Sequence, residues 1–457
     1  MNIYINVEIS SRELDSKLLL AVIAASKGHQ VLISDMSGID RGIRNKFFKP
    51  GIFHTKCISP YKEKIDFHDS LIQQGYVITS IDEESGLDIE GYDEFSKTRY
   101  SDKTIEQSSA VFAWGNDDME SLKKVYPKHI SKIYKTGSPR IDLTKSSFLE
   151  YWKSPNTMPK RPFLLISSNM SKANYIKPFY QLIKDNKQIK LYDHIKESFK
   201  HHFSWAAEDY LKTHSFIEAI KYLAKSNNDY DIVFRPHPVE NIESWKFYLE
   251  DIPNAHVIRE GAVTSWINNC FALMHCGCTT AIEATVAGKP VVSYVPFKMN
   301  YSASFTNKLG YHVESLEKLS STIDDIFNDR KSIDQKDLLK SSSEIFSKKI
   351  HLDKNELAAQ KIVKLWESLD NQKLSKPSSW GIYHLFLKIS NFKDKIGRYL
   401  RKIFPLRYLN FREDFKFPPL DKNNIFDKVN RLKNAIGVDK KLECKLLGKR
   451  TILIRRH

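Results

Sequence analysis

The sequence predicts an α/β protein of two successive domains, each a doubly wound parallel sheet covered by helices, followed by a basic helical tail. Three observations carry this prediction. Short apolar runs typical of strands alternate with amphipathic helical stretches. A polar, proline-bearing segment at 153–162 interrupts the alternation, which then restarts. Beyond residue 372 the composition becomes strongly basic. With 457 residues and 41% apolar side chains, the chain can fill the cores of about two to four domains.

We assign residues 1–155 to the first domain. Asn2 to Val7 is an apolar strand, residues 12–26 place apolar side chains on one helical face, and Gln30 to Ser34 is the next strand. The alternation then continues with helices near 67–75 and 117–125 and strands at 76–80, 110–114 and 132–135. Strands that alternate with helices in this way are typical of a Rossmann-like parallel sheet.

The second domain is predicted over residues 160–350. Its first strand is Phe163 to Ser167, and a long helical stretch covers about 174–224. Further strands are expected at 231–234, 256–258, 272–275 and 291–294. An amphipathic helix within 351–372 is expected to cross back over both domains, and residues 373–457 form the tail.

The net charge of the chain is concentrated in that tail. The whole chain carries 71 Lys and Arg against 55 Asp and Glu, a net charge of +16. Residues 373–457 alone carry 22 against 7, a net charge of +15. Because the two domains are nearly neutral, no basic groove for nucleic acid is predicted.

Within the tail, residues 380–404 place apolar side chains on one stripe and most Lys and Arg off it. A basic amphipathic helix of this kind suits the anionic inner membrane surface. The alternative is a helix that packs its apolar stripe on the protein body. The sequence has no run of about 18 apolar residues and no apolar leader. With five sparse cysteines as well, we expect a cytoplasmic protein, peripheral on the membrane at most.

The first chemical motif is an apolar strand that runs into Arg235-Pro236-His237-Pro238. The carboxyl ends of parallel strands are where ligands bind, and the two prolines fix the backbone there. His237 can donate to a phosphate oxygen or protonate it, and Arg235 can pair with phosphate through two hydrogen bonds. The plainer interpretation is a rigid strand exit with a structural histidine.

The second motif runs from Leu273 through His275-Cys276-Gly277-Cys278-Thr279-Thr280 to Glu283. It predicts a strand, a turn of small residues and a helix that opens on two hydroxyls. Thr279 and Thr280 are predicted to bind phosphate at the helix N-terminus, and Glu283 to accept from ribose hydroxyls. A plain N-cap and an ordinary first-turn acid are the alternatives. A single Cys-x-Cys is weak evidence for zinc, so no metal and no cofactor are expected.

Together these motifs resemble the donor-binding half of bacterial GT-B glycosyltransferases, especially surface-carbohydrate proteins related to capsule and lipopolysaccharide Kdo transferases. The first domain is also similar to that family over five short motifs: Glu8 to Asp15, Gly51 to Lys56, Asp82 to Gly86, Phe112 to Gly115 and Thr136 to Asp142. The resemblance covers about residues 1–300 and implies a GT-B-like fold, with two Rossmann-like domains facing a cleft.

The resemblance also implies a CMP-activated acidic sugar, Kdo-like or another nonulosonic acid, and a glycan or glycolipid acceptor. By position, His237, Pro238, Thr279 and Thr280 would hold the cytidine phosphate. The Asp that serves as the proposed nucleophile in retaining Kdo transferases has no counterpart after the strand that ends at Ser167. Other carboxylates in this half are Asp185, in a Gln-x-x-x-Asp run within a probable helix, and Glu208 and Asp209.

In the first domain, loops after strands are expected to meet the acceptor through Glu8, Arg12, His54, Glu83 and Glu84. One acid could take the proton of the acceptor hydroxyl, and Glu83 is our choice. Three other functions remain open: a sugar-nucleotide 2-epimerase, a UDP-sugar transferase of the same fold, and a catalytically inactive assembly protein.

Overall fold

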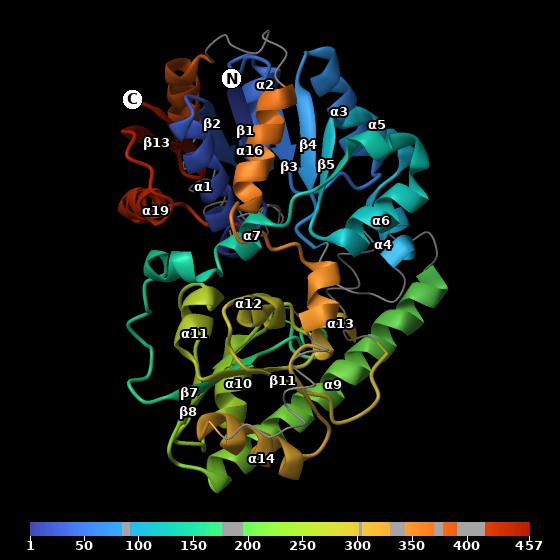
Figure 1. Ribbon diagram of the computed structural model, residues 1–457, viewed down its shortest axis with the longest axis vertical. Helices are drawn as coiled ribbons and strands as arrows, with labels where there is room; N and C mark the ends of the chain where they lie inside the picture. The colour runs from blue at the N-terminus through green and yellow to red at the C-terminus, as the bar shows by residue number, and fades with distance from the viewer. Residues whose placement is uncertain (85–91, 176–194, 301–303, 330–342, 370–377, 391–415) are drawn as a thin grey trace, which may run out of the picture. The chain divides into compact units, whose positions relative to one another are not determined.

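The computed structural model describes residues 1–84, 92–175, 195–300, 304–329, 343–369, 378–390 and 416–457, with only the backbone at 92, 195–202 and 304. The chain divides into two compact units (Figure 1). Unit 1 contains the described parts of residues 1–151 and 347–457, and unit 2 those of 152–346. The chain therefore leaves unit 1 after Tyr151 and returns to it at Ser347.

Unit 1 is built on an eight-stranded sheet of order β13-β14-β2-β1-β3-β4-β5-β6, in which β1 to β6 run parallel. The six parallel strands are β1 (Asn2–Asn6), β2 (Gln30–Ser34), β3 (Ile52–Thr55), β4 (Val77–Ile81), β5 (Ala110–Ala113) and β6 (Ile133–Lys135). The helices between them are α1 (Ser10–Ser26), α2 (Met36–Arg44), α3 (Lys62–Gln73), α4 (Tyr92–Arg99), α5 (Asp102–Gln107), α6 (Asn116–Val125) and α7 (Pro139–Asp142).

Helix α1 is buried almost all round, from Glu13 to Ala25. It contacts α16 (Ala358–Leu369) and α19 (Lys422–Ala435) as well as β2. A helix covered on every side needs apolar residues all round and not a single stripe. The consecutive apolar residues from Leu18 to Ala25 meet that need. Helices α16 and α19, from the C-terminal part of the chain, pack against α1.

Unit 2 holds a six-stranded parallel sheet of order β12-β11-β10-β7-β8-β9. Its strands are β7 (Phe163–Ser167), β8 (Asp231–Arg235), β9 (Ala255–Val257), β10 (Ala272–His275), β11 (Val291–Tyr294) and β12 (Tyr311–Val313). Its helices are α9 (Ile195–Ser226), α10 (Ile242–Leu249), α11 (Val263–Asn269), α12 (Thr280–Val286), α13 (Ser304–Asn307) and α14 (Leu316–Phe327). Apolar side chains of α9, α10 and α14 pack into one core with the strands.

Two Rossmann-like parallel sheets in one chain confirm the predicted fold class. The sequence analysis placed ten of these strands and missed β3, β12, β13 and β14.

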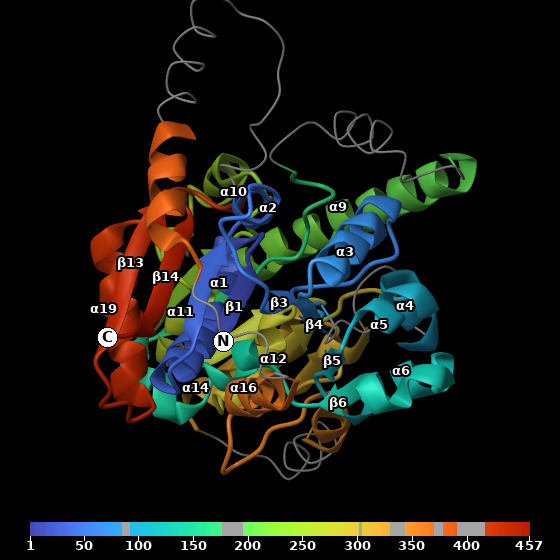
Figure 2. The same ribbon diagram turned by 90° about the horizontal axis from the view of Figure 1, so that it is seen from above.

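The C-terminal region differs from the separate basic tail that the sequence predicted. Strand β14 (Thr451–Arg456) pairs antiparallel with β2, and β13 (Leu442–Gly448) pairs with β14 at the sheet edge (Figure 2). The helix at 380–390 buries Trp380, Tyr383 and Leu387 in the core of unit 1. The continuation of the predicted stripe, at 391–404, lies outside the described residues. Net charge misled the interpretation because it averages over apolar strand residues such as Ile452 and Ile454.

The crossover helix also proves to be part of unit 1. Helix α16 contacts α1 and α7. Its Trp366 donates an indole hydrogen bond of 3.0 Å to Thr79 Oγ1 in β4. The described part of the chain beyond Phe346 therefore completes unit 1, with β13 and β14 at one edge of its sheet and α16 against α1 and α7.

The Ile454→Ala variant tests whether the C-terminal strand is structural. Ile454 is fully buried and lies opposite Val31 in β2, so its truncation leaves a cavity and should lower the free energy of unfolding by about 2–5 kcal/mol. Denaturant unfolding measures the change, with exposed Arg456→Ala as the control. Equal midpoints for Ile454→Ala and the wild type would mean that the strand does not belong to the folded core.

Candidate functional site

Both predicted phosphate motifs lie at the carboxyl edge of the sheet in unit 2. Strand β7 is flanked by β8 on one side and β10 on the other. The connections from β7 and β10 therefore depart in opposite directions, which makes this the switch point of the sheet. His237 and Pro238 follow β8, and Thr279 and Thr280 follow β10. The structure thus brings the two motifs to one edge, on either side of the loop that follows β7.

The loop after β7 is held by a buried carboxylate, that of Glu240. Its side chain accepts hydrogen bonds from Ser168 Oγ at 2.7 and 2.8 Å, from Met170 N at 2.8 Å and from Trp245 Nε1 at 2.7 Å. Glu240 is fully buried, and burial raises its pKa. Buried polar groups without such partners lower the stability of the fold. The loop therefore supplies hydrogen-bond donors to this carboxylate, and the carboxylate holds the loop in place.

Asn169 lies near the start of this loop and contacts the second motif. Its Nδ2 donates to Gly277 O at 2.7 Å, while Lys212 Nζ donates to its carbonyl at 3.2 Å. Gly277 has a φ of 66°, a conformation that favours glycine, and its N–H donates to Asn307 Oδ1 at 2.7 Å. The loops after β7 and β10 are therefore joined directly at the switch point.

A buried ion pair on α9 supports the same loop from another side. Lys212 Nζ lies 2.5 Å from Asp209 Oδ1, with each side chain 1% exposed. The other oxygen of Asp209 accepts from Lys172 N at 2.9 Å. Burial raises the pKa of Asp209, and the nearby Lys212 charge opposes that rise. Three buried charged side chains, counting Glu240, thus converge on one short segment, although the sequence analysis gave Lys212 and Glu240 no role.

Arg235, which was predicted to bind phosphate, is engaged in contacts within unit 2. Its guanidinium donates to Glu260 O at 2.8 Å and to Gly261 O at 2.9 Å, and it lies 5.2 Å from the ring centre of Trp266. Burial, with the Arg259 charge, lowers its pKa to about 10. Arg235 therefore ties the end of β8 to the turn that precedes α11, as a structural residue.

His237 is partly accessible in the loop after β8. It is half-buried, and its Nδ1 accepts a hydrogen bond of 3.4 Å from Val239 N. An imidazole whose Nδ1 accepts carries its hydrogen on Nε2 when neutral, so Nε2 is the donor. The half-buried ring between two prolines matches the predicted role better than a core histidine would.

His275, by contrast, is a core histidine. It is fully buried, and burial lowers its pKa to about 3, so the ring is neutral. Its Nδ1 accepts from Cys278 N at 3.3 Å, and its Nε2 lies 3.1 Å from Ser293 Oγ. The ring shapes the turn that leads to α12. Among the described residues, no group of His, Cys, Asp and Glu is arranged to hold a metal ion.

The three residues predicted to bind phosphate and ribose lie at the start of α12 and make different contacts. Thr279 occupies the N-cap position, but its side chain makes no capping bond, while Thr280 donates its hydroxyl to Cys278 Sγ at 3.1 Å. Glu283 is buried, and its Oε2 accepts from Thr264 Oγ1 at 3.3 Å. The predicted ribose contact of Glu283 is therefore replaced by a bond to α11, because its side chain points into the protein.

In unit 1, four of the five predicted acceptor residues gather at the carboxyl edge of the sheet. Glu8 follows β1, Arg12 opens α1, and Glu83 and Glu84 follow β4. Arg12 lies 3.5 Å from Glu84, and Lys56, after β3, lies 2.5 Å from Glu8. Strands β1 and β3 flank the switch point of this sheet, so the Lys56–Glu8 pair spans it.

These carboxylates are poor candidates for the predicted general base. Burial opposes the charge on Glu83, but Lys17 Nζ at 2.5 Å outweighs it and lowers the pKa of Glu83. Burial likewise opposes the charge on Glu8, and Lys56 and Lys416 lower its pKa to about 2. A base with so low a pKa holds a proton weakly at neutral pH.

His54 lies inside strand β3 and not in an acceptor loop. It is fully buried, with Nδ1 3.1 Å from Thr79 Oγ1 and its ring 5.1 Å from that of Trp366. Burial, together with the Lys17 charge, lowers its pKa well below the ordinary range. The predicted acceptor contact of His54 is therefore wrong: the sequence analysis missed β3, and with it the place of this side chain.

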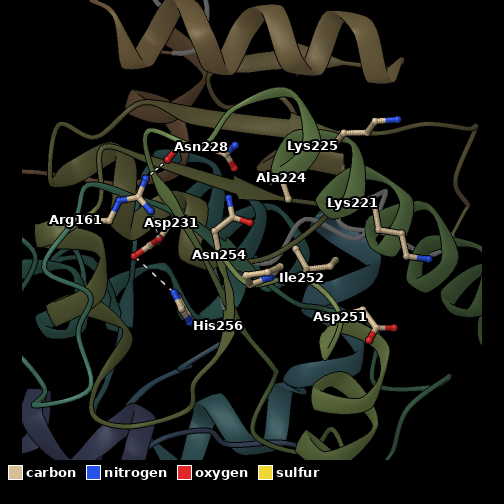
Figure 3. Close-up of a pocket in the computed structure, with 11 residues that line it drawn as sticks. Arg161, Lys221, Ala224, Lys225, Asn228, Asp231, Asp251, Ile252, Asn254 and His256 are labelled. Carbon is tan, nitrogen blue, oxygen red and sulfur yellow. Dashed lines mark hydrogen bonds and ion pairs between the residues drawn. The ribbon is translucent and has the colours of Figure 1, made fainter.

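A pocket of 620 Å³ lies elsewhere in unit 2 (Figure 3). Its lining includes Asp231, which begins β8, Asn254, which precedes β9, and Lys221 and Lys225 of α9. Asp231 pairs there with Arg161 at 3.2 Å. This is the amino edge of the sheet, opposite the edge that carries both motifs.

We compared the chain with known proteins. No family model matches it, and no curated protein does. Solved structures of similar fold include a putative UDP-N-acetylglucosamine 2-epimerase from Listeria monocytogenes, with TM-score 0.49 and 12% identity over 81% of this chain and 97% of that one. A glycosyltransferase from Rickettsia africae gives TM-score 0.45 and 12% identity over 81% of this chain and 99% of that one. The UDP-GlcNAc 2-epimerase of Methanocaldococcus jannaschii gives TM-score 0.47 and 13% identity over 80% of this chain and 100% of that one. Superposition this loose carries no argument about activity, so function has to be argued from the residues.

Replacing Glu240 tests the anchoring of the loop after β7. Glu240→Ala leaves the N–H groups of Met170 and Trp245 buried without an acceptor, which should lower the free energy of unfolding by about 3 kcal/mol or more. Glu218→Ala removes an exposed acid paired with Lys221 and should cost less than about 0.5 kcal/mol. Urea denaturation of both variants gives the comparison. Similar losses in the two would mean that Glu240 fixes nothing.

The Lys17–Glu83 pair predicts a specific pattern in a double-mutant cycle. Lys17→Met leaves a buried carboxylate unpaired and should cost about 3–5 kcal/mol at pH 7, whereas adding Glu83→Gln should recover part of that loss. Because the folded pKa of Glu83 is depressed, the stabilisation by the pair is present above the ordinary pKa of 4.5. It should fade as the pH falls below that value, in the wild type and not in the double variant. Additive losses at pH 7 would contradict the pairing.

Proposed function

We propose that the protein is a glycosyltransferase that takes its sugar from a nucleotide-linked donor. One observation carries the proposal: His237 and Thr279 follow the two strands that flank β7, around a loop that buried charges hold in place. Ligands of open α/β sheets bind at the carboxyl edge, at the switch point. Burying these charges costs desolvation free energy. That cost is explained if the loop has to hold a fixed position against a ligand.

In the proposed reaction, unit 2 stabilises the departing nucleotide phosphate. The bond between the anomeric carbon and the phosphate oxygen breaks, and its electron pair leaves with the nucleotide. A new bond forms between the anomeric carbon and the acceptor oxygen, whose proton passes to solvent water. Donors aimed at the oxygen that gains charge speed such a step. His237 Nε2 and the Thr279 hydroxyl are the donors assigned here, and Pro236 and Pro238 restrict the backbone of the first.

The proposed donor is a CMP-linked acidic sugar, Kdo-like or another nonulosonic acid. This part of the proposal rests on the resemblance of the motifs to surface-carbohydrate transferases. The proposed acceptor is a growing bacterial surface polysaccharide or lipopolysaccharide, at the carboxyl edge of unit 1. Arg12 and Glu84 are partly exposed there, at 26% and 32%, as is Glu8 at 39%, and these three side chains are proposed to meet the sugar.

Direct displacement is the proposed course of the transfer. The segment 168–175, which follows β7, contains no Asp or Glu and carries Asn169 as its second residue. An amide is a poor nucleophile, and the nearest buried acids, Asp209 and Glu240, are already bound to the loop. Attack by the acceptor itself, with inversion at the anomeric carbon, requires no carboxylate in this loop.

Ligand-induced stabilisation of the purified protein tests the proposal. A ligand that binds only the folded state at 100 times its dissociation constant adds about 2.7 kcal/mol of apparent stability. CMP should raise the melting temperature, His237→Ala should abolish that rise, and His256→Ala should preserve it. His256 is the matched control because it is also partly exposed in unit 2 but lines the pocket at the amino edge.

The same assay with CDP, UDP and GDP separates the other functions. A rise with UDP and none with CMP would contradict the donor assignment and favour a 2-epimerase or a UDP-sugar transferase. No rise with any nucleotide would favour an inactive assembly protein. An equal loss in His237→Ala and His256→Ala would contradict the assigned site.

A further inference from the structure

The helix at 380–390 of unit 1 is apolar on two faces. One face packs into the core through Trp380, Tyr383 and Leu387. The other face carries Ile382, Leu385 and Ile389, which remain 60%, 58% and 50% exposed. Spacings of three and four residues place these three side chains on one side of the helix. The sequence analysis offered packing or membrane contact as alternatives, but the helix has enough apolar residues for both.

The exposed stripe is continuous with half-buried aromatic rings. Phe386 of the helix and Phe47, which follows α2, lie 5.2 Å apart between ring centres. Ser379 N donates to Phe47 O at 2.9 Å, which holds the two segments side by side. Single exposed apolar side chains are common, whereas a contiguous patch marks a surface that contacts something other than water.

Cations lie beside this patch, in the segment that holds Phe47 and on the helix itself. Arg44, Lys46 and Lys49 come from the segment beside the helix and are exposed, as is Lys388 on the helix itself. Lys46 has a φ of 56° and so sits in the turn that ends α2. Asp40 pairs with Arg44 at 2.7 Å. The three lysines and this pair leave the rim with a net positive charge.

We propose that this face of unit 1, the stripe of Ile382, Leu385 and Ile389 with its lysine rim, docks on an anionic lipid surface. Apolar side chains flanked by cations match the interface of an anionic bilayer, where acyl chains meet phosphates. A second copy of the chain fits less well, because a symmetric contact would bring the two lysine rims together.

This surface lies in unit 1 and uses none of the residues assigned to nucleotide binding. Lipid docking can therefore fail its test while the proposed function stands, and the proposed function can fail while lipid docking stands. Docking here would hold the protein at a lipid–water boundary and leave no part of the helix spanning the bilayer. Among the residues that the structure describes, no helix is long and apolar enough to cross a membrane.

Vesicle flotation of the full chain tests the proposal. Vesicles of phosphatidylcholine with about 30% phosphatidylglycerol should bind the wild type, and pure phosphatidylcholine should bind it about tenfold less. The triple variant Ile382→Ser, Leu385→Ser, Ile389→Ser and the double variant Lys46→Glu, Lys49→Glu should each lose about tenfold in affinity for the anionic vesicles. Phe247→Ser, at an α10 residue 68% exposed in unit 2, is the matched control and should bind as the wild type does.

Unchanged melting temperature and unchanged nucleotide binding in the variants would show that they fold. Wild type that stays away from anionic vesicles would overturn the proposal, as would a triple variant that binds them fully. Sedimentation velocity tests whether the patch binds a second copy of the chain. A wild type that forms a dimer and a triple variant that does not would assign the patch to that second copy.

Discussion

The buried carboxylate of Glu240 is the constraint on which the edge of unit 2 depends. Its oxygens face the hydroxyl of Ser168, the backbone N–H of Met170 and the indole of Trp245 at 2.7–2.8 Å. An ionised group can stay in an apolar core only while such donors surround it. The loop after β7 is thus tied to the segment that follows β8. The contact from Asn169 to Gly277 ties it also to the turn after β10.

Unit 1 uses charge in a different way at the equivalent edge. Its acids are paired with Lys17, Lys56 and other cations, so burial raises their energy while the pairing keeps them ionised. Ionised and paired carboxylates shape a polar surface, but they take up protons weakly. Most of the catalytic contribution that we propose therefore comes from stabilising the departing phosphate in unit 2. Lys416 and Lys428 bind Glu8 and Asp15, so the C-terminal region completes this edge.

Sequence reasoning reached the two-sheet fold, ten strands and the edge that carries His237 and Thr279, because long apolar strands and the strand–turn–helix order are local signals. It failed at His54, Arg235 and Glu283, whose residue types suggested ligand contacts. Their partners, Thr79, the carbonyls of Glu260 and Gly261, and Thr264, are brought close only by the tertiary fold. The sequence analysis missed strand β14 because its partner β2 lies more than 400 residues earlier in the chain.

The most direct measurement is hydrogen exchange of the backbone amides with and without CMP, read by mass spectrometry. Our account predicts slower exchange in the loops after β8 and β10, around His237 and Thr279, together with the loop that Glu240 holds. It predicts no change around Asn254 and His256 at the amino edge. Protection confined to that amino-edge pocket, or none anywhere in unit 2, would contradict the assignment of the carboxyl edge as the nucleotide site.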